Sequence, residues 1–193
     1  MRIFIAVLVL IFSLQSFTKA DDIRDFEIEG ISVGDSLLDY LSEDYIKNQI
    51  VKNDYMYSYT DKKYIGVRIK EIDTKEYEYL SATIKRKGDY QYIIHSIRGS
   101  FDIDEPEKCK KKQYEIDKDL AEIFGLEIRR DFIVNSKVDT TGKSKVHGII
   151  FDLKDGSGIS VTCYNYSSHI DRPSGLDVSI RNSEFSNWIR KDW

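Results

Sequence analysis

Apolar and polar residues alternate along most of the chain after residue 53, and this period of two predicts β-strands. Short polar turns at residues 61–62, 88–89 and 154–158 join neighbouring segments, so we expect the strands to pair as antiparallel hairpins. The segments expected to form strands are residues 54–60, 63–72, 76–87, 90–103, 145–153, 158–166 and 175–182.

A period of 3.6 residues predicts a long helix in the middle of the chain, over residues 104–125. Pro106 stands near the start of this segment and Gly125 just past its end, the positions that each residue favours at a helix. The side chains expected on the buried face of this helix are Cys109, Ile116, Leu120, Ile123 and Phe124.

Two shorter helices are predicted near the ends of the chain. Ser32 and Asp35 form a variant of the capping box, and the apolar stripe that follows consists of Val33, Leu37, Leu38 and Leu41. At the other end, Ser183 can cap a helix that buries Phe185, Trp188 and Ile189. Hairpins with helices near the N-terminus, in the middle and at the C-terminus predict an α+β fold, mainly an antiparallel sheet with helices packed on one face.

The N-terminus predicts export from the cytoplasm. Met1 and Arg2 precede a wholly apolar run at residues 3–12, and a polar stretch follows that ends at Ala20. The run is shorter than the ~20 residues that cross a bilayer, so a cleaved signal peptide over 1–20 is favoured over an uncleaved anchor. We therefore expect one domain over residues 21–193, located in the periplasm or secreted, with no transmembrane segment after cleavage.

Charge argues against nucleic acid as a partner. The chain has 29 basic and 33 acidic side chains and a net charge of −4, and loss of Arg2 and Lys19 with the signal peptide makes the mature chain more acidic. Nucleic acid binding depends on basic side chains that neutralise phosphates. The expected partners are instead an envelope protein or a small ligand.

Two cysteines, Cys109 and Cys163, are present, and an even count in an exported protein favours a disulfide. Cys109 lies on the apolar face of the predicted central helix. Cys163 shares the apolar side of its predicted strand with Ile159 and Val161. Because a helix packed on a sheet brings such faces together, we expect a bond between the two, with two separate buried thiols as the alternative.

The letters Gly-Asp-Ser-Leu at residues 34–37 resemble the motif that names a family of serine esterases. That family implies a parallel α/β fold and an Asp three positions before a catalytic His. The residues three positions before His95, His147 and His169 are Tyr92, Ser144 and Tyr166. We therefore interpret Ser36 as an ordinary hydroxyl and expect no catalytic residue at this motif.

The remaining candidate chemistry is sparse. No pair of histidines shows the spacing of metal ligands, so no metal and no cofactor are expected. His169 and Asp171 are the most reactive-looking pair and support an enzyme of unrecognised type. Thirteen tyrosines support a binding surface, since tyrosine gives a large contact area at low entropic cost. The tyrosines expected to contribute are Tyr77, Tyr79, Tyr90 and Tyr92.

Three stretches carry a resemblance over the whole mature chain: "FEIEGISVGDSLLDYLSED" (26–44), "CKKKQYEIDKDLAEIFG" (109–125) and "GLDVSIRNSEFSNWI" (175–189). In these stretches the chain resembles a group of uncharacterised small exported proteins of AT-rich Gram-negative bacteria. The resemblance implies a periplasmic location and assigns no activity to any residue. The expected function is a non-enzymatic exported binding or interaction module of the cell envelope, and the alternative is a periplasmic enzyme.

Overall fold

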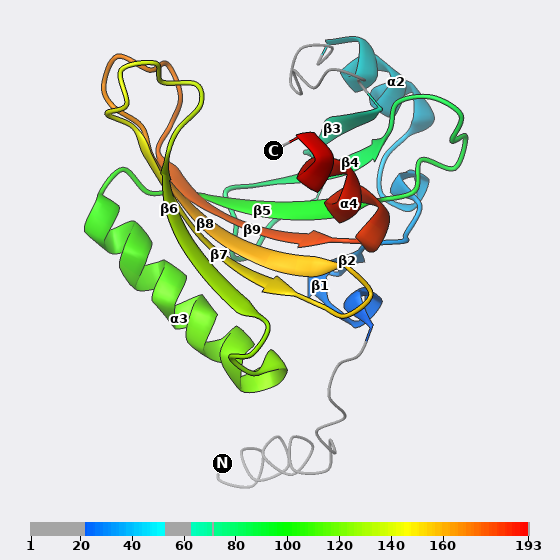
Figure 1. Ribbon diagram of the computed structural model, residues 1–193. Coiled ribbons are helices and arrows are strands. Elements are labelled where there is room, and N and C mark those ends of the chain that lie inside the picture. Colours follow the sequence, from blue (N-terminus) through cyan, green and yellow to red (C-terminus); the bar gives the residue numbers. More distant parts are fainter. Residues whose placement is uncertain (1–21, 53–62, 71, 193) are drawn as a thin grey trace, which may run out of the picture.

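A seven-stranded antiparallel sheet forms the centre of the computed structural model, which describes residues 22–52, 63–70 and 72–192 (Figure 1). The strand order is β3-β4-β5-β9-β8-β7-β6, and every neighbouring pair is antiparallel. This confirms the α+β prediction. The strands are β3 (Tyr64–Ile69), β4 (Tyr79–Lys85), β5 (Ser96–Asp102), β6 (Arg129–Asn135), β7 (Lys145–Asp152), β8 (Gly158–Asn165) and β9 (Gly175–Arg181).

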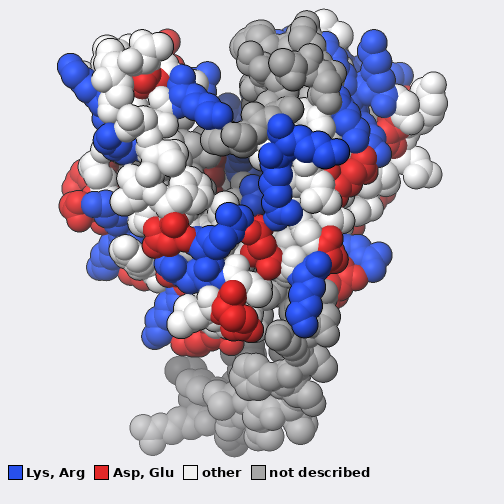
Figure 2. Space-filling model, viewed as in Figure 1, with Lys and Arg blue, Asp and Glu red and all other residues white. Residues whose placement is uncertain are grey.

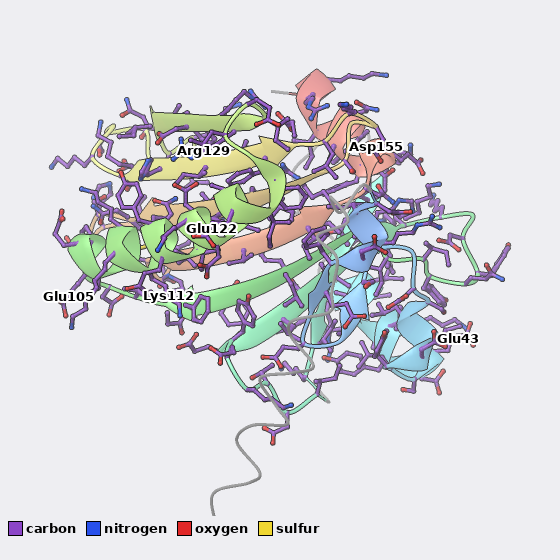
Figure 3. The ribbon with its side chains drawn as sticks, turned by 90° about the horizontal axis from the view of Figure 1, so that it is seen from below. Glu43, Glu105, Lys112, Glu122, Arg129 and Asp155 are labelled. Carbon is purple, nitrogen blue, oxygen red and sulfur yellow. A yellow bond between two sulfur atoms is a disulfide. The ribbon has the colours of Figure 1, made fainter. Side chains whose placement is uncertain are left out.

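Successive side chains in each strand point to opposite faces of the sheet, and one of these faces is apolar. We call it the core face; its buried side chains include Ile65, Ile84, Ile97, Ile159 and Ile180. The N-terminal segment covers one part of it, and helix α3 (Pro106–Phe124) covers the part formed by β8 and β9. Figure 3, seen from below, shows α3 lying across the sheet, with Glu105 at one end and Lys112 and Glu122 along its length.

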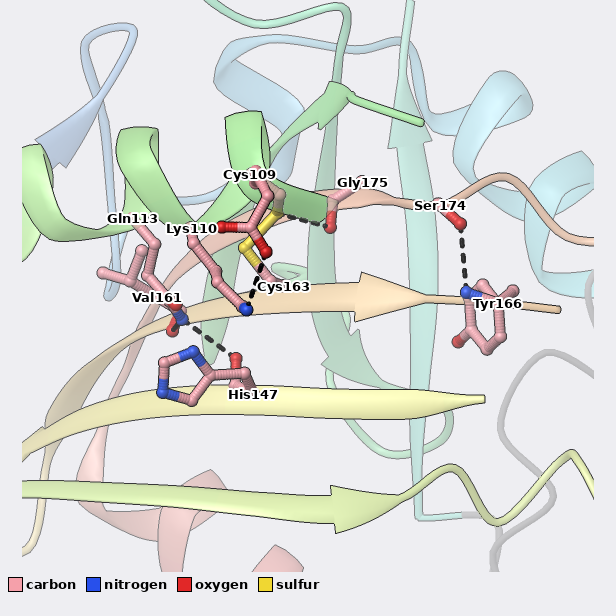
Figure 4. The surroundings of a disulfide bond; sticks show 10 residues. Cys109, Lys110, Gln113, His147, Val161, Cys163, Tyr166, Ser174 and Gly175 are labelled. Carbon is pink, nitrogen blue, oxygen red and sulfur yellow. Dashed lines mark hydrogen bonds and ion pairs between the residues drawn. A yellow bond between two sulfur atoms is a disulfide. The ribbon is translucent and has the colours of Figure 1, made fainter. Parts of the chain in front are cut away.

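Helix α3 has the predicted position and most of its predicted buried face. Cys109 and Phe124 are buried, and Gly125 follows the last residue with a φ of 83°. Ile123, which the pattern placed on this face, is 46% exposed, because it lies one residue off the stripe that contacts the sheet. Gln113 is fully buried instead, and its Nε2 donates to the carbonyls of His147 at 2.9 Å and Val161 at 2.8 Å (Figure 4).

The disulfide between Cys109 on α3 and Cys163 on β8 is present, with a Cα–Cα distance of 6.0 Å (Figure 4). It joins residues 54 positions apart and fixes the start of α3 to the core face. The prediction of this bond is confirmed. A disulfide is compatible with an oxidising compartment outside the cytoplasm.

The predicted helix near Ser32 is wrong. Residues 31–32 form β2, which pairs with β1 (Glu27–Ile28), and only the 3-10 turn η2 (Leu37–Asp39) follows, after the 3-10 turn η1 (Ile23–Asp25). The α-helix in this region, α2 (Glu43–Lys52), begins later. Residues 34–37 instead pair with residues 92–94 through three backbone hydrogen bonds, and these engage the N–H groups of Gly34 and Leu37 and the carbonyl of Asp35, which a continuous helix would need.

Helix α4 (Ser183–Asp192) confirms the C-terminal helix but lies on the face of the sheet opposite α3 (Figure 1). Phe185 and Trp188 pack against Tyr64, whose side chain alternates with the core-face residue Ile65. The prediction that all helices share one face is therefore wrong for α4. The cap is also one residue earlier than expected, because Asn182 Oδ1 accepts from the N–H of Phe185 at 3.0 Å.

Strand β6 lies at the sheet edge and was not among the predicted strands, because most of its side chains are exposed and show no alternation. Residues 90–95 were predicted as part of β5 but form a turn and an isolated bridge. The expected strand at 54–60 and the signal peptide at 1–20 lie outside the described residues. Within the described ranges, no helix is long and apolar enough to cross a membrane.

Candidate functional site

The face of the sheet opposite α3, which we call the open face, has short hydroxyl side chains at its centre. In the register of the strands, Ser81 lies opposite Arg98, Arg98 opposite Ser179, and Ser179 opposite Ser160. A helix or second sheet packed here would favour apolar side chains instead. We call this group the hydroxyl floor, and its members are Ser81, Thr83, Ser96, Ser100, Ser160, Thr162 and Ser179.

Four arginines surround the hydroxyl floor and share two carboxylates. Arg130 Nε donates to Asp152 Oδ2 at 2.8 Å, and Arg190 Nη2 donates to Asp152 Oδ1 at 2.6 Å. Arg98 Nη1 lies 3.5 Å from Asp177 Oδ2, and Ser100 Oγ donates to the other oxygen of Asp177 at 2.6 Å.

Arg181 is the fourth arginine, and it lies between Ser96 of β5 and Gly158 of β8. Its Nε is buried without a hydrogen-bond partner among the described residues. Burial lowers the pKa of its guanidinium, and the nearby charges of Arg190 and Arg98 act in the same direction against the opposing effect of Asp152. Counted over the described residues, this group holds four arginines and two carboxylates, Asp152 and Asp177, on a chain whose net charge is −4.

The open face is recessed between two walls. Figure 1 shows α4 over one end of the sheet and the loops at 136–144 and 166–174 rising at the other end. Figure 2 shows a hollow between these loops and the part of the molecule that carries α4, with Lys and Arg side chains along it. Within the floor, Ser160, Thr162 and Ser179 are 7%, 8% and 7% exposed, so each presents only a small part of its surface to solvent.

The two loops are joined by the carboxylate of Asp139. It accepts from Ser144 Oγ at 2.6 Å within its own loop and from Ser167 Oγ at 3.0 Å in the other. Hydrogen bonds from Ser144 and Thr141 hold the pKa of Asp139 well below its usual range. His169 Nε2 lies 3.1 Å from Asp139 Oδ1, so the histidine that the sequence paired with Asp171 has a different carboxylate as its partner.

Ser167, His169 and Asp139 stand in the order of a serine-hydrolase triad. Ser167 Oγ is 3.0 Å from His169 Nδ1, and the other ring nitrogen of His169 contacts Asp139. Ser167 Oγ is equally close to Asp139 itself, at 3.0 Å, which gives its proton a carboxylate acceptor. We therefore interpret this group as a tie between two loops that form one wall of the open face.

The predicted tyrosine surface is not assembled. The ring of Tyr77 lies over Gly99 and Phe101 on the core face, whereas Tyr79 lies on the open face under the guanidinium of Arg68. Tyr90 is 88% exposed, and Tyr92 is buried with its hydroxyl 3.5 Å from Glu43 Oε1.

The histidines and Ser36 also have separate surroundings. His95 contacts Asn182 and Glu184, and burial lowers its pKa, whereas His147 Nε2 lies 3.2 Å from Asp131. In the described ranges no group of three or more His, Cys, Asp and Glu residues is placed to hold a metal ion. Ser36 Oγ donates to the carbonyl of Gln91 at 2.7 Å and accepts from the N–H of Leu38, which is a structural role.

The sequence analysis missed the arginines, although a signal for them was present. In "SIRGS" (96–100) the positions that alternate with the core-facing residues are Ser96, Arg98 and Ser100. In "DVSIR" (177–181) they are Asp177, Ser179 and Arg181. Such short and cationic side chains on the second face of central strands are the pattern that identifies the site. Comparison with protein-family models, with curated proteins and with solved structures finds no match for this chain.

Proposed function

We propose that this protein is an exported binding module that takes a small acidic ligand, bearing a carboxylate or phosphate, on its open face. The observation that carries the proposal is the sharing of two carboxylates, Asp152 and Asp177, among four arginines beside a recessed floor of hydroxyls. A ligand anion would supply the negative charge that the cluster lacks.

The chemistry of the open face suits an acid. Guanidinium groups bind carboxylates and phosphates through paired, charge-assisted hydrogen bonds, which are about twice as strong as neutral ones. Arg181 adds a guanidinium beside the floor whose Nε has no hydrogen-bond partner among the described residues. Ser and Thr hydroxyls both donate and accept, so the floor can bond the neutral parts of the same ligand.

Location in the periplasm or outside the cell is part of this proposal. It is supported by the Cys109–Cys163 disulfide, by the apolar run at residues 3–12 and by the resemblance to small exported proteins of Gram-negative bacteria. Binding without catalysis is supported by the direct contact between Ser167 and Asp139, which removes the best candidate nucleophile.

The test is isothermal titration calorimetry of the mature protein, with inorganic phosphate and citrate as the two ligands. We expect Arg181→Gln to weaken binding about ten-fold or more, because one charge-assisted hydrogen bond is lost. Arg24→Gln is the matched control, since Arg24 is exposed and pairs with Asp22 far from this face. Absence of binding to either acid at about 10 mM, or equal affinity in both variants, contradicts the proposal.

A further inference from the structure

Aromatic side chains lie at the loop end of the open face. Tyr164 on β8 and Tyr166 just after it have stacked rings, with centroids 5.9 Å apart and planes 13° apart. Nearby, the ring of Phe132 covers Gly148, because a Cβ on that glycine would lie 2.3 Å from the ring. Both Phe132 and Tyr164 occupy open-face positions in the register of β6, β7 and β8. The open face thus has an aromatic end and a cationic end.

The hydroxyl floor connects these two ends. Ser160, which lies in one row with Ser179 and Arg98, precedes Tyr164 by four positions on β8. Four residues of strand span about 13 Å, which is too long for a single small acid and suits a chain of roughly two or three sugar rings.

A saccharide with acid groups matches all three parts. The C–H faces of a sugar ring stack on tyrosine, as at many sites where one side of the ligand is apolar. Its hydroxyls can donate to and accept from Ser160, Thr162 and Ser179 on the floor. Its carboxylates suit the arginines. A nucleotide fits less well, because reading a base edge favours amide side chains, and the floor has only hydroxyls.

We infer that the ligand of the open face is a short acidic oligosaccharide, held by its rings on Tyr164 and Tyr166 and by its carboxylates on Arg98 and Arg181. This inference rests on the proposed function, since it names the class of acid that the same face binds.

The experiment compares four probes by calorimetry on the mature protein: inorganic phosphate, monomeric galacturonate, a panel of acidic trisaccharides (of galacturonate, glucuronate and mannuronate), and neutral galactotriose. We expect at least one acidic trisaccharide to bind about ten-fold more tightly than the monomer, because stacking and floor contacts are added to the charge contacts. Galactotriose should bind more weakly than that trisaccharide by a similar factor, because it offers the arginines no charge.

Variants separate the two ends of the site. Tyr166→Ala should weaken the trisaccharide about three- to ten-fold and leave phosphate unchanged, whereas Arg181→Gln should weaken both. Tyr90→Ala, which removes a tyrosine that is 88% exposed elsewhere on the chain, should change neither.

The outcomes are distinct. If phosphate or monomeric galacturonate binds as tightly as every acidic trisaccharide, or if Tyr166→Ala is without effect, the saccharide inference fails and the proposed function stands. If galactotriose binds as tightly as the best acidic trisaccharide, the acid part of the inference fails. If no acid in the set binds at all, the proposed function fails with it.

Discussion

Replacing Arg181 by Met should make the protein more stable. The Nε of Arg181 is buried and has no hydrogen-bond partner in the part of the chain that the structure describes, and burial lowers the pKa of the guanidinium, so the folded state holds a cation that these residues do not fully satisfy. An unsatisfied buried donor costs about 1–3 kcal/mol, and Met has a similar length without a polar group. Allowing for the lost attraction to Asp152, we expect the free energy of unfolding to rise by about 1 kcal/mol. A midpoint about 2–4 °C higher would follow for a chain of this size.

Arg129→Met is the matched comparison, because Arg129 is also largely buried but is fully paired. Its Nε and Nη2 donate to the two oxygens of Asp117 at 2.7 and 3.0 Å. Removing it leaves Asp117 without its cation, so we expect a loss of about 2–3 kcal/mol. Urea unfolding followed by circular dichroism measures both variants. If Arg181→Met loses more than about 1 kcal/mol, Arg181 is a structural residue and the case for a ligand at this face fails.

Three further outcomes are expected. Reduction of the Cys109–Cys163 bond should lower the free energy of unfolding by about 4 kcal/mol, since the bond joins residues 54 positions apart, and circular dichroism with and without reductant should still show a folded sheet. Asp139→Asn should destabilise the protein at neutral pH, because the carboxylate accepts hydrogen bonds from Ser144 and Ser167. Folding lowers the pKa of Asp139, so its contribution to stability is complete above the unfolded pKa of ~3.9, and in urea titrations the difference in unfolding free energy between wild type and variant should shrink only below about pH 4. Ser36→Ala should cost about 1 kcal/mol through the lost cap, and an assay with short acyl esters should show no turnover in either protein.

Local patterns in the sequence predicted the parts of the fold that depend on local interactions. The 3.6-residue repeat of apolar positions in α3 and the two-residue alternation in β7, β8 and β9 are patterns of residues close together in the sequence. The same patterns placed Cys109 and Cys163 on the two faces that pack together. The N-terminal segment follows a different rule. Its helical pattern near Ser32 is overridden by pairing of residues 34–37 with residues 92–94, and such long-range pairing leaves no trace in a local pattern.

The candidate site was harder to predict because its parts come from distant places in the chain. Arg98 and Arg181 are brought together only because β5 pairs with β9, and that neighbour relation depends on the crossing of α3 to the far edge of the sheet. His169 and Asp139 meet for a similar reason, since their loops belong to two hairpins that lie side by side.

An alternating strand carries two patterns at once, and only one of them was used to predict the fold. The apolar positions of β5 and β9 predict a core, and the remaining positions are usually assigned to solvent. In this protein those positions hold Ser96, Ser100 and Ser179, which are nearly as buried as the core, around Arg98 and Arg181. The short Ser and Thr side chains at the centre of this face extend less far from the sheet than the arginine and Tyr164 side chains around them. The polar half of a central strand is therefore worth reading separately from its apolar half, because in β5 and β9 it holds small hydroxyls beside paired Arg and Asp side chains.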